Sequence, residues 1–180
     1  MPRRKFIASV PFLMLGSRLL NEQESVRPSS RAIQELREEL TPAESKLVKS
    51  SALAQDLLDC LQNGYSCAES MFMVSLKFLG KSKKLVWIAS GFGGGMRHRD
   101  LCGFLTGGLM AIGLSSGKLN MEREAAKAIC EQKVKEYWQW WTSAAPLHCL
   151  EIRTEERTSK TCVRLGQLAS VKVEELIKSK

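Results

Sequence analysis

The sequence predicts an all-α fold, in which a compact single-domain helical bundle follows an N-terminal segment of different character. Two observations support this prediction. Apolar residues recur at helical spacing along most of the chain after residue 40, and two expected helix starts carry a capping box, a Ser or Thr followed three residues later by Glu. The 180 residues suffice for one domain with a substantial core. We assign residues 1–40 to a signal-like segment and linker, and residues 41–180 to the helical domain.

The basic charge does not indicate binding to nucleic acid. The chain has 27 basic and 19 acidic residues, which gives a net charge of +8. The basic residues are scattered among acidic ones, without a long run or a stripe interleaved with aromatic residues. We interpret them as a solvated surface and expect no nucleic-acid partner.

The N-terminal segment resembles a twin-arginine export signal. Arg3 and Arg4 precede Phe6 and Ile7, and a short apolar run follows. The run is too short to span a bilayer and no Ala-x-Ala cleavage site follows it, so a basic tail is the alternative. The sequence leaves two localisations open, the periplasm and the cytoplasm, and predicts no stable transmembrane span.

The first helix of the domain should begin after Thr41. Thr41 suits the N-cap, Pro42 suits the first helical position, and Glu44 completes a capping box. The helix should continue to Asn63, where Gly64 stops it. Its expected apolar positions are Leu47, Leu53, Leu57, Leu58 and Leu61.

A second helix should begin at Cys67. Ser66 and Glu69 form another capping box, and the helix should run to Leu79, with Gly80 as its stop. Free N–H groups and the helix dipole at this end lower the pKa of a thiol and favour the thiolate. The sequence position alone fits an inert buried thiol equally well.

A glycine-rich turn occupies the middle of the chain, because nine of the thirteen glycines lie between residues 91 and 117. It follows a short apolar segment, residues 84–90. A strand followed by glycines resembles a dinucleotide motif, but that motif needs glycine where Met96 stands, and no phosphate-loop Gly-Lys-Ser/Thr follows. We therefore predict no nucleotide site. The glycines expected to donate backbone N–H groups to another ligand are Gly93, Gly94 and Gly95.

The turn should lead into a helix over residues 100–113. Asp100 is its expected cap, and Cys102 should lie in its first turn. The helix is too short to span a membrane. A strip of small residues on it would let another backbone or a bulky cofactor approach closely. The strip consists of Gly103, Gly107 and Gly108.

Two further helices should complete the domain. The first covers residues 121–143, and we interpret its aromatic cluster as core rather than as a shield over a site. A proline-containing turn carries Cys149. Thr158 or Ser159 should cap the last helix, with Cys162 in its first turn. The expected buried positions of these two helices are Ala126, Cys130, Val134, Tyr137, Trp141, Val163, Leu165, Leu168, Val171 and Leu176.

Four of the six cysteines share a position at an expected helix start. Cys60 and Cys130 lie inside helices and are assigned to the core. Helix N-termini supply the N–H donors and partial positive charge that clustered thiolates need, so we predict that the other four meet at one redox or metal site. These four are Cys67, Cys102, Cys149 and Cys162.

These segments resemble the C-GCAxxG-C-C family, whose members are described as redox-active and related to the iron–sulfur domain of split-Soret cytochrome c. The resemblance is carried by residues 64–70, 91–96 and 102–107 together with Cys149 and Cys162, and it covers roughly residues 50–178. It implies a helical fold. It also implies redox or metal-ligand roles for Cys67, Cys102, Cys149 and Cys162.

The chain departs from the family pattern in two places. Phe104 stands where the family usually has alanine, and Arg97, His98 and Arg99 replace smaller residues before Cys102. Phe104 would either crowd a cofactor or point away from it.

The leading hypothesis is that the four thiolates bind an iron–sulfur cluster, of the 2Fe-2S type, for electron transfer or redox sensing with a redox partner protein. The glycine turn and Gly103 would contact the cluster. One alternative is a metal-free thiol–disulfide protein; another is a helical domain with a structural zinc ion or disulfides. The histidines, His98 and His148, are interpreted as surface residues, with ligation or proton relay as their alternative. No Ser-His-Asp set indicates a hydrolase, and a homodimer is the oligomeric state to test.

Overall fold

The computed structural model describes residues 40–117, 121–153 and 159–179. Over these ranges all regular structure is helical, apart from one isolated bridge between Leu101 and His148, so the predicted all-α class is confirmed. The signal-like segment lies outside the described residues, as does the candidate cap Thr158. None of the described helices is long and apolar enough to cross a membrane.

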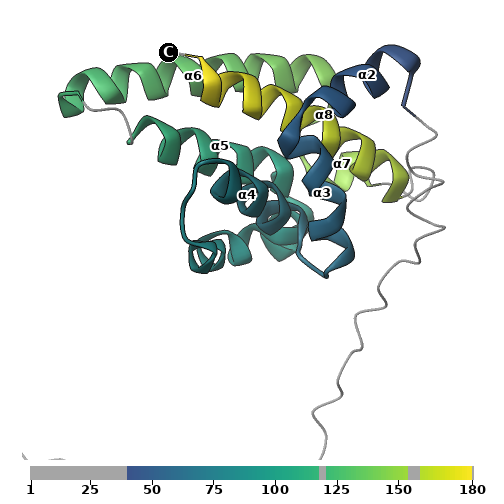
Figure 1. Ribbon diagram of the computed structural model, residues 1–180. Helices are drawn as coiled ribbons and strands as arrows, with labels where there is room; N and C mark the ends of the chain where they lie inside the picture. Colours follow the sequence, from purple (N-terminus) through teal and green to yellow (C-terminus); the bar gives the residue numbers. More distant parts are fainter. Residues whose placement is uncertain (1–39, 118–120, 154–158, 180) are drawn as a thin grey trace, which may run out of the picture.

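The helices form a compact bundle (Figure 1). They are α2 (Pro42–Ser50), α3 (Ala52–Gln62), α4 (Cys67–Phe78), the 3₁₀ helix η1 (Lys83–Phe92), the short π-type turn η2 (Gly95–Arg99), α5 (Gly103–Ser116), α6 (Arg123–Ala144), α7 (Cys149–Ile152) and α8 (Ser159–Lys178). The start of α6 extends beyond the rest of the bundle.

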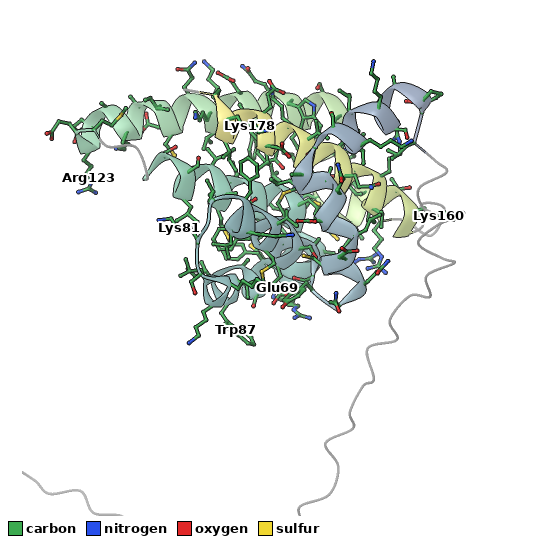
Figure 2. The ribbon with its side chains drawn as sticks, in the orientation of Figure 1. Glu69, Lys81, Trp87, Arg123, Lys160 and Lys178 are labelled. Carbon is green, nitrogen blue, oxygen red and sulfur yellow. The ribbon has the colours of Figure 1, made fainter. Side chains whose placement is uncertain are left out.

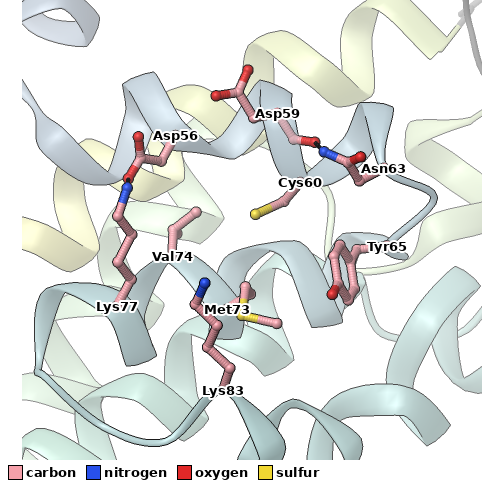
Figure 3. Close-up of a pocket in the computed structure, with 9 residues that line it drawn as sticks. All are labelled: Asp56, Asp59, Cys60, Asn63, Tyr65, Met73, Val74, Lys77 and Lys83. Carbon is pink, nitrogen blue, oxygen red and sulfur yellow. Dashed lines mark hydrogen bonds and ion pairs between the residues drawn. The ribbon is translucent and has the colours of Figure 1, made fainter.

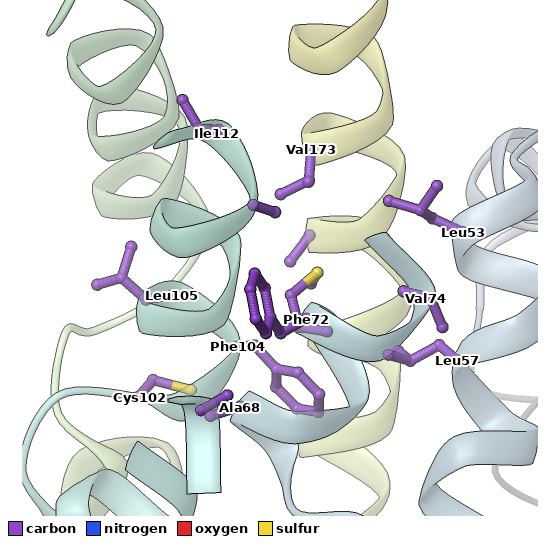
Figure 4. Close-up of a cluster of buried hydrophobic side chains, with 14 of the residues drawn as sticks. Leu53, Leu57, Ala68, Phe72, Val74, Cys102, Phe104, Leu105, Ile112 and Val173 are labelled. Carbon is purple, nitrogen blue, oxygen red and sulfur yellow. The ribbon is translucent and has the colours of Figure 1, made fainter. Parts of the chain in front are cut away.

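Helices α4 and α5 form the centre of the core. Both helices carry apolar or small residues around nearly their whole circumference. They must therefore be surrounded by other helices rather than lie on the surface. Helix α4 packs against α3, α5 and η1, while α8 packs against α3 and α5. Figure 4 shows the resulting cluster, in which Leu57, Phe72 and Val173 come from three different helices.

The first helix of the domain is interrupted, contrary to the prediction of one helix from Thr41 to Asn63. The capping box at Thr41 and Glu44 is present, but Ser51 adopts an extended conformation and separates α2 from α3. Leu47, predicted to be buried, is 51% exposed because α2 follows a different direction from α3.

The start of α3 is held by a carboxylate from the other end of the chain. Glu174 of α8 is 4% exposed and accepts hydrogen bonds from the Ser51 hydroxyl at 2.6 Å and from the Leu53 amide at 2.9 Å. Lys178 pairs with the second carboxylate oxygen. Because free amides at a helix start need an acceptor, Glu174 satisfies a requirement that α3 cannot meet alone.

Replacing Glu174 with Gln should lower the free energy of unfolding at pH 7 by about 1–3 kcal/mol, because a buried charge-assisted network loses its anion. Burial raises the pKa of this carboxyl, but Lys178, Ser51 and Leu53 outweigh burial and hold the pKa below its usual value. The stabilisation is therefore present above the pKa of the unfolded chain and lost as the pH falls through the lower folded-state pKa. Urea unfolding between pH 7 and pH 3 measures this loss.

The matched control is Glu175→Gln, because this neighbouring side chain is exposed and pairs only with Lys172. It should change stability by less than about 0.5 kcal/mol. Equal stability of the Glu174→Gln variant and the parent at pH 7 would show that the carboxylate does not hold α3.

The segment before the glycine turn and the helix after it both differ from the prediction in detail. Residues 84–90 lie in the 3₁₀ helix η1. Helix α5 begins at Gly103 with Cys102 as its N-cap, and it continues to Ser116. Asp100, the predicted cap, instead pairs with the His148 ring. Leu101 pairs with His148 in the isolated bridge and the Cys102 amide donates to the Leu147 carbonyl, so helix α5 begins only at Gly103.

Two members of the aromatic cluster of α6 lie in the core, as predicted, whereas Trp138 is exposed. Tyr137 and Trp141 are fully buried and pack edge-to-face. The polar groups of these two side chains both have a hydrogen-bond partner. The Tyr137 hydroxyl donates to the Phe104 carbonyl at 3.1 Å, and the Trp141 indole N–H donates to the Pro146 carbonyl at 3.0 Å. These bonds tie α6 to the start of α5 and to the turn that precedes α7.

Candidate functional site

Cys67 is the first residue of α4, as predicted. Its neighbour Ser66 accepts from the Glu69 amide, and the Glu69 carboxylate accepts from the Ser66 amide at 2.8 Å, so the capping box is complete. The other Glu69 oxygen accepts from the Ser90 hydroxyl of η1. The backbone around the Cys67 thiol is therefore fixed from two sides.

The Cys67 sulfur lies directly against Gly103 of α5. A Cβ atom added at Gly103 would stand 2.2 Å from the Cys67 sulfur and 2.9 Å from the Ala68 amide nitrogen. Gly107, one turn later, is as close to the backbone of Ala68, where an added Cβ would stand 2.7 Å from the carbonyl oxygen. The predicted small-residue strip therefore lets α4 approach, with Cys67 at its end.

The third glycine of that strip has another neighbour. A Cβ atom at Gly108 would stand 2.6 Å from the ring of Tyr137, so this glycine admits an aromatic side chain of α6. The strip is filled by the protein's own backbone and side chains at all three positions.

The glycine turn packs on the start of α4. A Cβ atom at Gly93 would stand 2.5 Å from the Ser66 side chain, and one at Gly95 would stand 2.5 Å from the Asp100 carbonyl oxygen. Gly94 and Gly95 both have a backbone φ of +63°, which residues with a side chain rarely adopt. Close contacts and positive φ angles thus explain why glycine occupies these three positions. The donation of their backbone N–H groups to a ligand stays a prediction.

Cys102 is the most buried of the six cysteines, with 6% of its surface exposed. It lies at the N-cap of α5, and its amide donates to the Leu147 carbonyl at 2.9 Å. In Figure 4 its sulfur points toward Ala68, the residue after Cys67. Cys102 and Cys67 therefore lie on facing ends of the two central helices.

Cys149 is brought to the same region by backbone pairing. Its amide donates to the Asp100 carbonyl at 2.7 Å, next to the bridge between Leu101 and His148. The Asp100 carboxylate lies 2.7 Å from Nδ1 of the His148 ring. The short helix α7 begins at Cys149, so this thiol is also at a helix start.

The four predicted cysteines interact electrostatically with one another. Burial is the largest cause of the raised pKa at Cys102, Cys149 and Cys162, and a negative charge on Cys67 raises the pKa of all three further. Cys162, in the first turn of α8, adds to the effect at Cys102, and Cys149 adds to the effect at Cys162. The structure thus brings four distant segments within reach of each other's charge.

The expectation of low thiol pKa values is wrong for three of these residues. The pKa of Cys102 rises to about 12, although the backbone N–H groups of Phe104 and Leu105 favour its thiolate. The pKa values of Cys149 and Cys162 are also raised, by burial first and then by neighbouring thiolates. Loss of water and mutual repulsion outweigh the helix N-termini, because clustering places the negative charges together.

The remaining two cysteines, Cys60 and Cys130, were assigned to the core from sequence. Cys130 is partly buried against the main core. Cys60 lines a separate cavity of about 210 Å³ between α3 and α4, where Figure 3 shows it among charged side chains. Burial and then the charges of Asp56 and Asp59 raise its pKa to about 11. Neither cysteine is among the causes of the raised pKa of Cys102, Cys149 or Cys162.

Both departures from the family pattern have a structural explanation. Phe104 lies against α8, where a Cβ atom added at Gly166 would stand 2.7 Å from its ring. The absence of a side chain at Gly166 therefore leaves room for the Phe104 ring within the core. Arg97, His98 and Arg99 are exposed, and Arg99 donates to the Arg153 carbonyl at 2.9 Å.

Sequence reasoning missed three neighbours of the thiols. Arg99 and Arg153 lower the pKa of Cys149, opposing the thiolate repulsion, and Arg153 does the same for Cys162. The buried hydroxyl of Tyr137 has its pKa raised, first by burial and then by the charge of Cys102. No local pattern identified these residues, since they approach the thiols from separate helices and turns.

The thiols are not arranged as ligands of a single ion. Among the described residues, no group of three or more His, Cys, Asp or Glu side chains could hold a metal ion as placed. A structural zinc site, which needs four ligands around one point, gains no support from this geometry. All six cysteines are free thiols.

These features define a class: a small all-α protein with four of its free cysteines at or near helix starts. The chain belongs to the C-GCAxxG-C-C family, whose model, described as "Putative redox-active protein (C_GCAxxG_C_C)", matches residues 65–176. No curated protein and no solved structure matches the chain. The matched range begins just before Cys67 and includes all four proposed site cysteines.

Proposed function

We propose that Cys67, Cys102, Cys149 and Cys162 bind an iron–sulfur cluster of the two-iron type, which serves electron transfer or redox sensing. The observation that carries the proposal is that the Cys67 sulfur lies against Gly103, the residue after Cys102, while the Cys149 amide bonds to Asp100, two residues before Cys102. Four cysteine thiolates are the usual ligand set of a two-iron cluster. When bound, such a cluster supplies a one-electron redox couple.

The raised pKa values support a metal partner for these thiols. A buried thiol such as Cys102, with a pKa near 12, is almost wholly protonated at neutral pH and is a poor nucleophile. Coordination to a cation removes the proton and offsets the repulsion between neighbouring thiolates. A cluster therefore resolves the unfavourable electrostatics that four bare thiolates would create.

The protein's own groups would control the potential of the site. The N–H groups of Phe104 and Leu105 stabilise negative charge on Cys102, and Arg99 and Arg153 stabilise it on Cys149. Donors and cations near sulfur favour the more negative, reduced state of such a centre. Cys102 is buried and shielded from water, while Cys67, Cys149 and Cys162 are only partly buried.

The test is purification of the full chain without oxygen, followed by measurement of iron, acid-labile sulfide, the visible spectrum and the electron paramagnetic resonance spectrum of the reduced protein. We expect iron and sulfide in equal amounts and a signal that appears on reduction. Colourless protein without iron, after reconstitution with iron and sulfide as well, would rule out the cluster.

A second candidate is metal-free thiol–disulfide chemistry. It is favoured by the free state of all six cysteines and by the lack, among the described residues, of three ligands around one point. In this case two thiols of the group would lose two electrons and two protons to an acceptor disulfide and form a disulfide bond. Mass spectrometry after alkylation with and without reductant distinguishes the two, because a stripped cluster leaves four free thiols.

A further inference from the structure

An aromatic and an aliphatic side chain project together from η1. Trp87 is 78% exposed and Ile88 is 58% exposed, whereas their neighbours Val86 and Ala89 are buried. The buried pair attaches η1 to α4, and the Ser90 hydroxyl bond to Glu69 fixes its end. The two exposed apolar side chains are therefore presented by an anchored segment.

Lysines accompany these two apolar side chains. Lys81, Lys83 and Lys84 are exposed and lie just before η1 or at its start. Figure 2 shows Trp87 at the outer edge of the molecule, with Lys81 on the same side. We call the surface formed by Lys81, Lys83, Lys84, Trp87 and Ile88 the tryptophan tip.

Shallow apolar hollows flank the tryptophan tip on both sides. One, of about 270 Å³, is lined by Lys84 and Trp87 together with side chains of α4. The other, of about 400 Å³, is lined by Lys81, Ile88 and Met110 among others. Each hollow thus combines an exposed apolar side chain of the tip with a lysine at its rim.

Two carboxylates close to the tryptophan tip already bind other groups of the protein. Glu69 accepts hydrogen bonds from the Ser66 amide and the Ser90 hydroxyl, and Asp56 pairs with Lys77. Asp59 of α3 lies across the cavity that Lys83 lines (Figure 3). Lys81 and Lys84 do not line that cavity but border the two hollows, so the tip presents positive charge beside exposed apolar groups.

We propose that the tryptophan tip binds the surface of an anionic lipid bilayer, with Trp87 and Ile88 entering the interfacial region and Lys81 and Lys84 contacting lipid head groups. Tryptophan is enriched at membrane interfaces, and lysines close to an anionic surface each strengthen binding. A stable protein interface would need a far larger apolar area than two projecting side chains provide. Charge complementarity and the small area of the tip both favour the lipid surface.

The test compares full-length variants in sedimentation with vesicles of equimolar phosphatidylcholine and phosphatidylglycerol, and with vesicles of phosphatidylcholine alone. We expect the parent chain to bind the anionic vesicles only. Trp87→Ala should weaken this binding about tenfold, because a large apolar side chain no longer enters the interface. Lys81→Gln and Lys84→Gln should weaken it about fivefold each.

Matched controls lie on α6. Trp138 is also partly exposed, at 37%, and Lys127 and Lys135 are exposed lysines of the same helix. Trp138→Ala and the double Lys127→Gln, Lys135→Gln variant should bind anionic vesicles like the parent. Every variant keeps residues 1–39, so any attraction contributed by Arg3 and Arg4 is common to all.

Fluorescence supplies an independent readout. Vesicles of brominated lipid should quench the tryptophan fluorescence of the parent chain. The Trp87→Phe variant should still bind these vesicles but lose most of that quenching. Failure of the parent to bind anionic vesicles would overturn the proposal. Equal binding of anionic vesicles by the Trp87→Ala variant and the parent would also overturn it, and a protein surface would then be the partner to test for the tip.

Discussion

Replacement of Cys67 by alanine is expected to lower the bound iron of anaerobically purified protein by at least about tenfold. Loss of a group that only orients a metal ligand already costs tenfold or more in metal affinity, and Cys67 is proposed as a ligand itself. Cys67 is also the cysteine whose charge reaches the three other thiols. Its loss should therefore affect the whole site rather than one edge.

The matched controls are Cys60→Ala and Cys130→Ala. Both residues are partly buried cysteines that pack against the same core but lie outside the thiol group. They should keep the iron, sulfide and spectrum of the parent. Equal iron in the Cys67→Ala variant and in these controls would contradict the assignment of the site.

The same variant gives a readout that does not depend on metal. Burial and then the charge of Cys67 raise the pKa of Cys149, so removing Cys67 should lower the pKa of Cys149 in metal-free protein. The pH dependence of alkylation at Cys149, followed by mass spectrometry, measures this change. An unchanged pKa would mean that the two thiols are farther apart than the structure has them.

Replacement of Gly103 by alanine should destabilise the protein by about 1–3 kcal/mol and reduce the bound iron at the same time. The added Cβ atom would stand 2.2 Å from the Cys67 sulfur and 2.9 Å from the Ala68 amide nitrogen, so α4 and α5 must separate or the thiol must turn away. Overpacking of a well-filled core typically costs this much free energy. Urea unfolding and iron analysis on the same preparation check both effects.

Gly113→Ala in the same helix is the control. Apart from its chain neighbours and the backbone of its own helix, no atom of the described residues lies within 4 Å of the position that its Cβ would take. Because alanine favours helix more than glycine does, this variant should gain about 0.4–1 kcal/mol and keep its iron. A destabilisation of similar size at both positions would mean that the contact with Cys67 is not the cause.

Most of the fold could be predicted from local sequence. The capping boxes at Thr41 and Ser66 give the correct starts of α2 and α4, because a cap depends only on residues three positions apart. The break at Ser51 could not be predicted, since the carboxylate that holds the start of α3 comes from Glu174. The start of α5 was misplaced because Asp100 pairs with His148 instead of capping the helix.

The candidate cysteines could be chosen from sequence, but their electrostatics could not. The positions of the four cysteines at helix starts separated them from Cys60 and Cys130, and their role in one site stays a prediction. The direction of the pKa shifts could not be predicted, because burial and thiolate repulsion depend on where distant segments meet. Phe104 was ambiguous for the same reason until its partner Gly166 was identified.

The sequence by itself determined the helical class and the family, and it identified four cysteines as candidates for one site, since periodicity, capping and motif spacing are properties of neighbouring residues. The tertiary structure alone decided which thiols repel one another, which glycines are needed for close packing, and which apolar side chains remain on the surface. Those properties depend on contacts between residues far apart in the chain, where burial and the distance between charges set the energies.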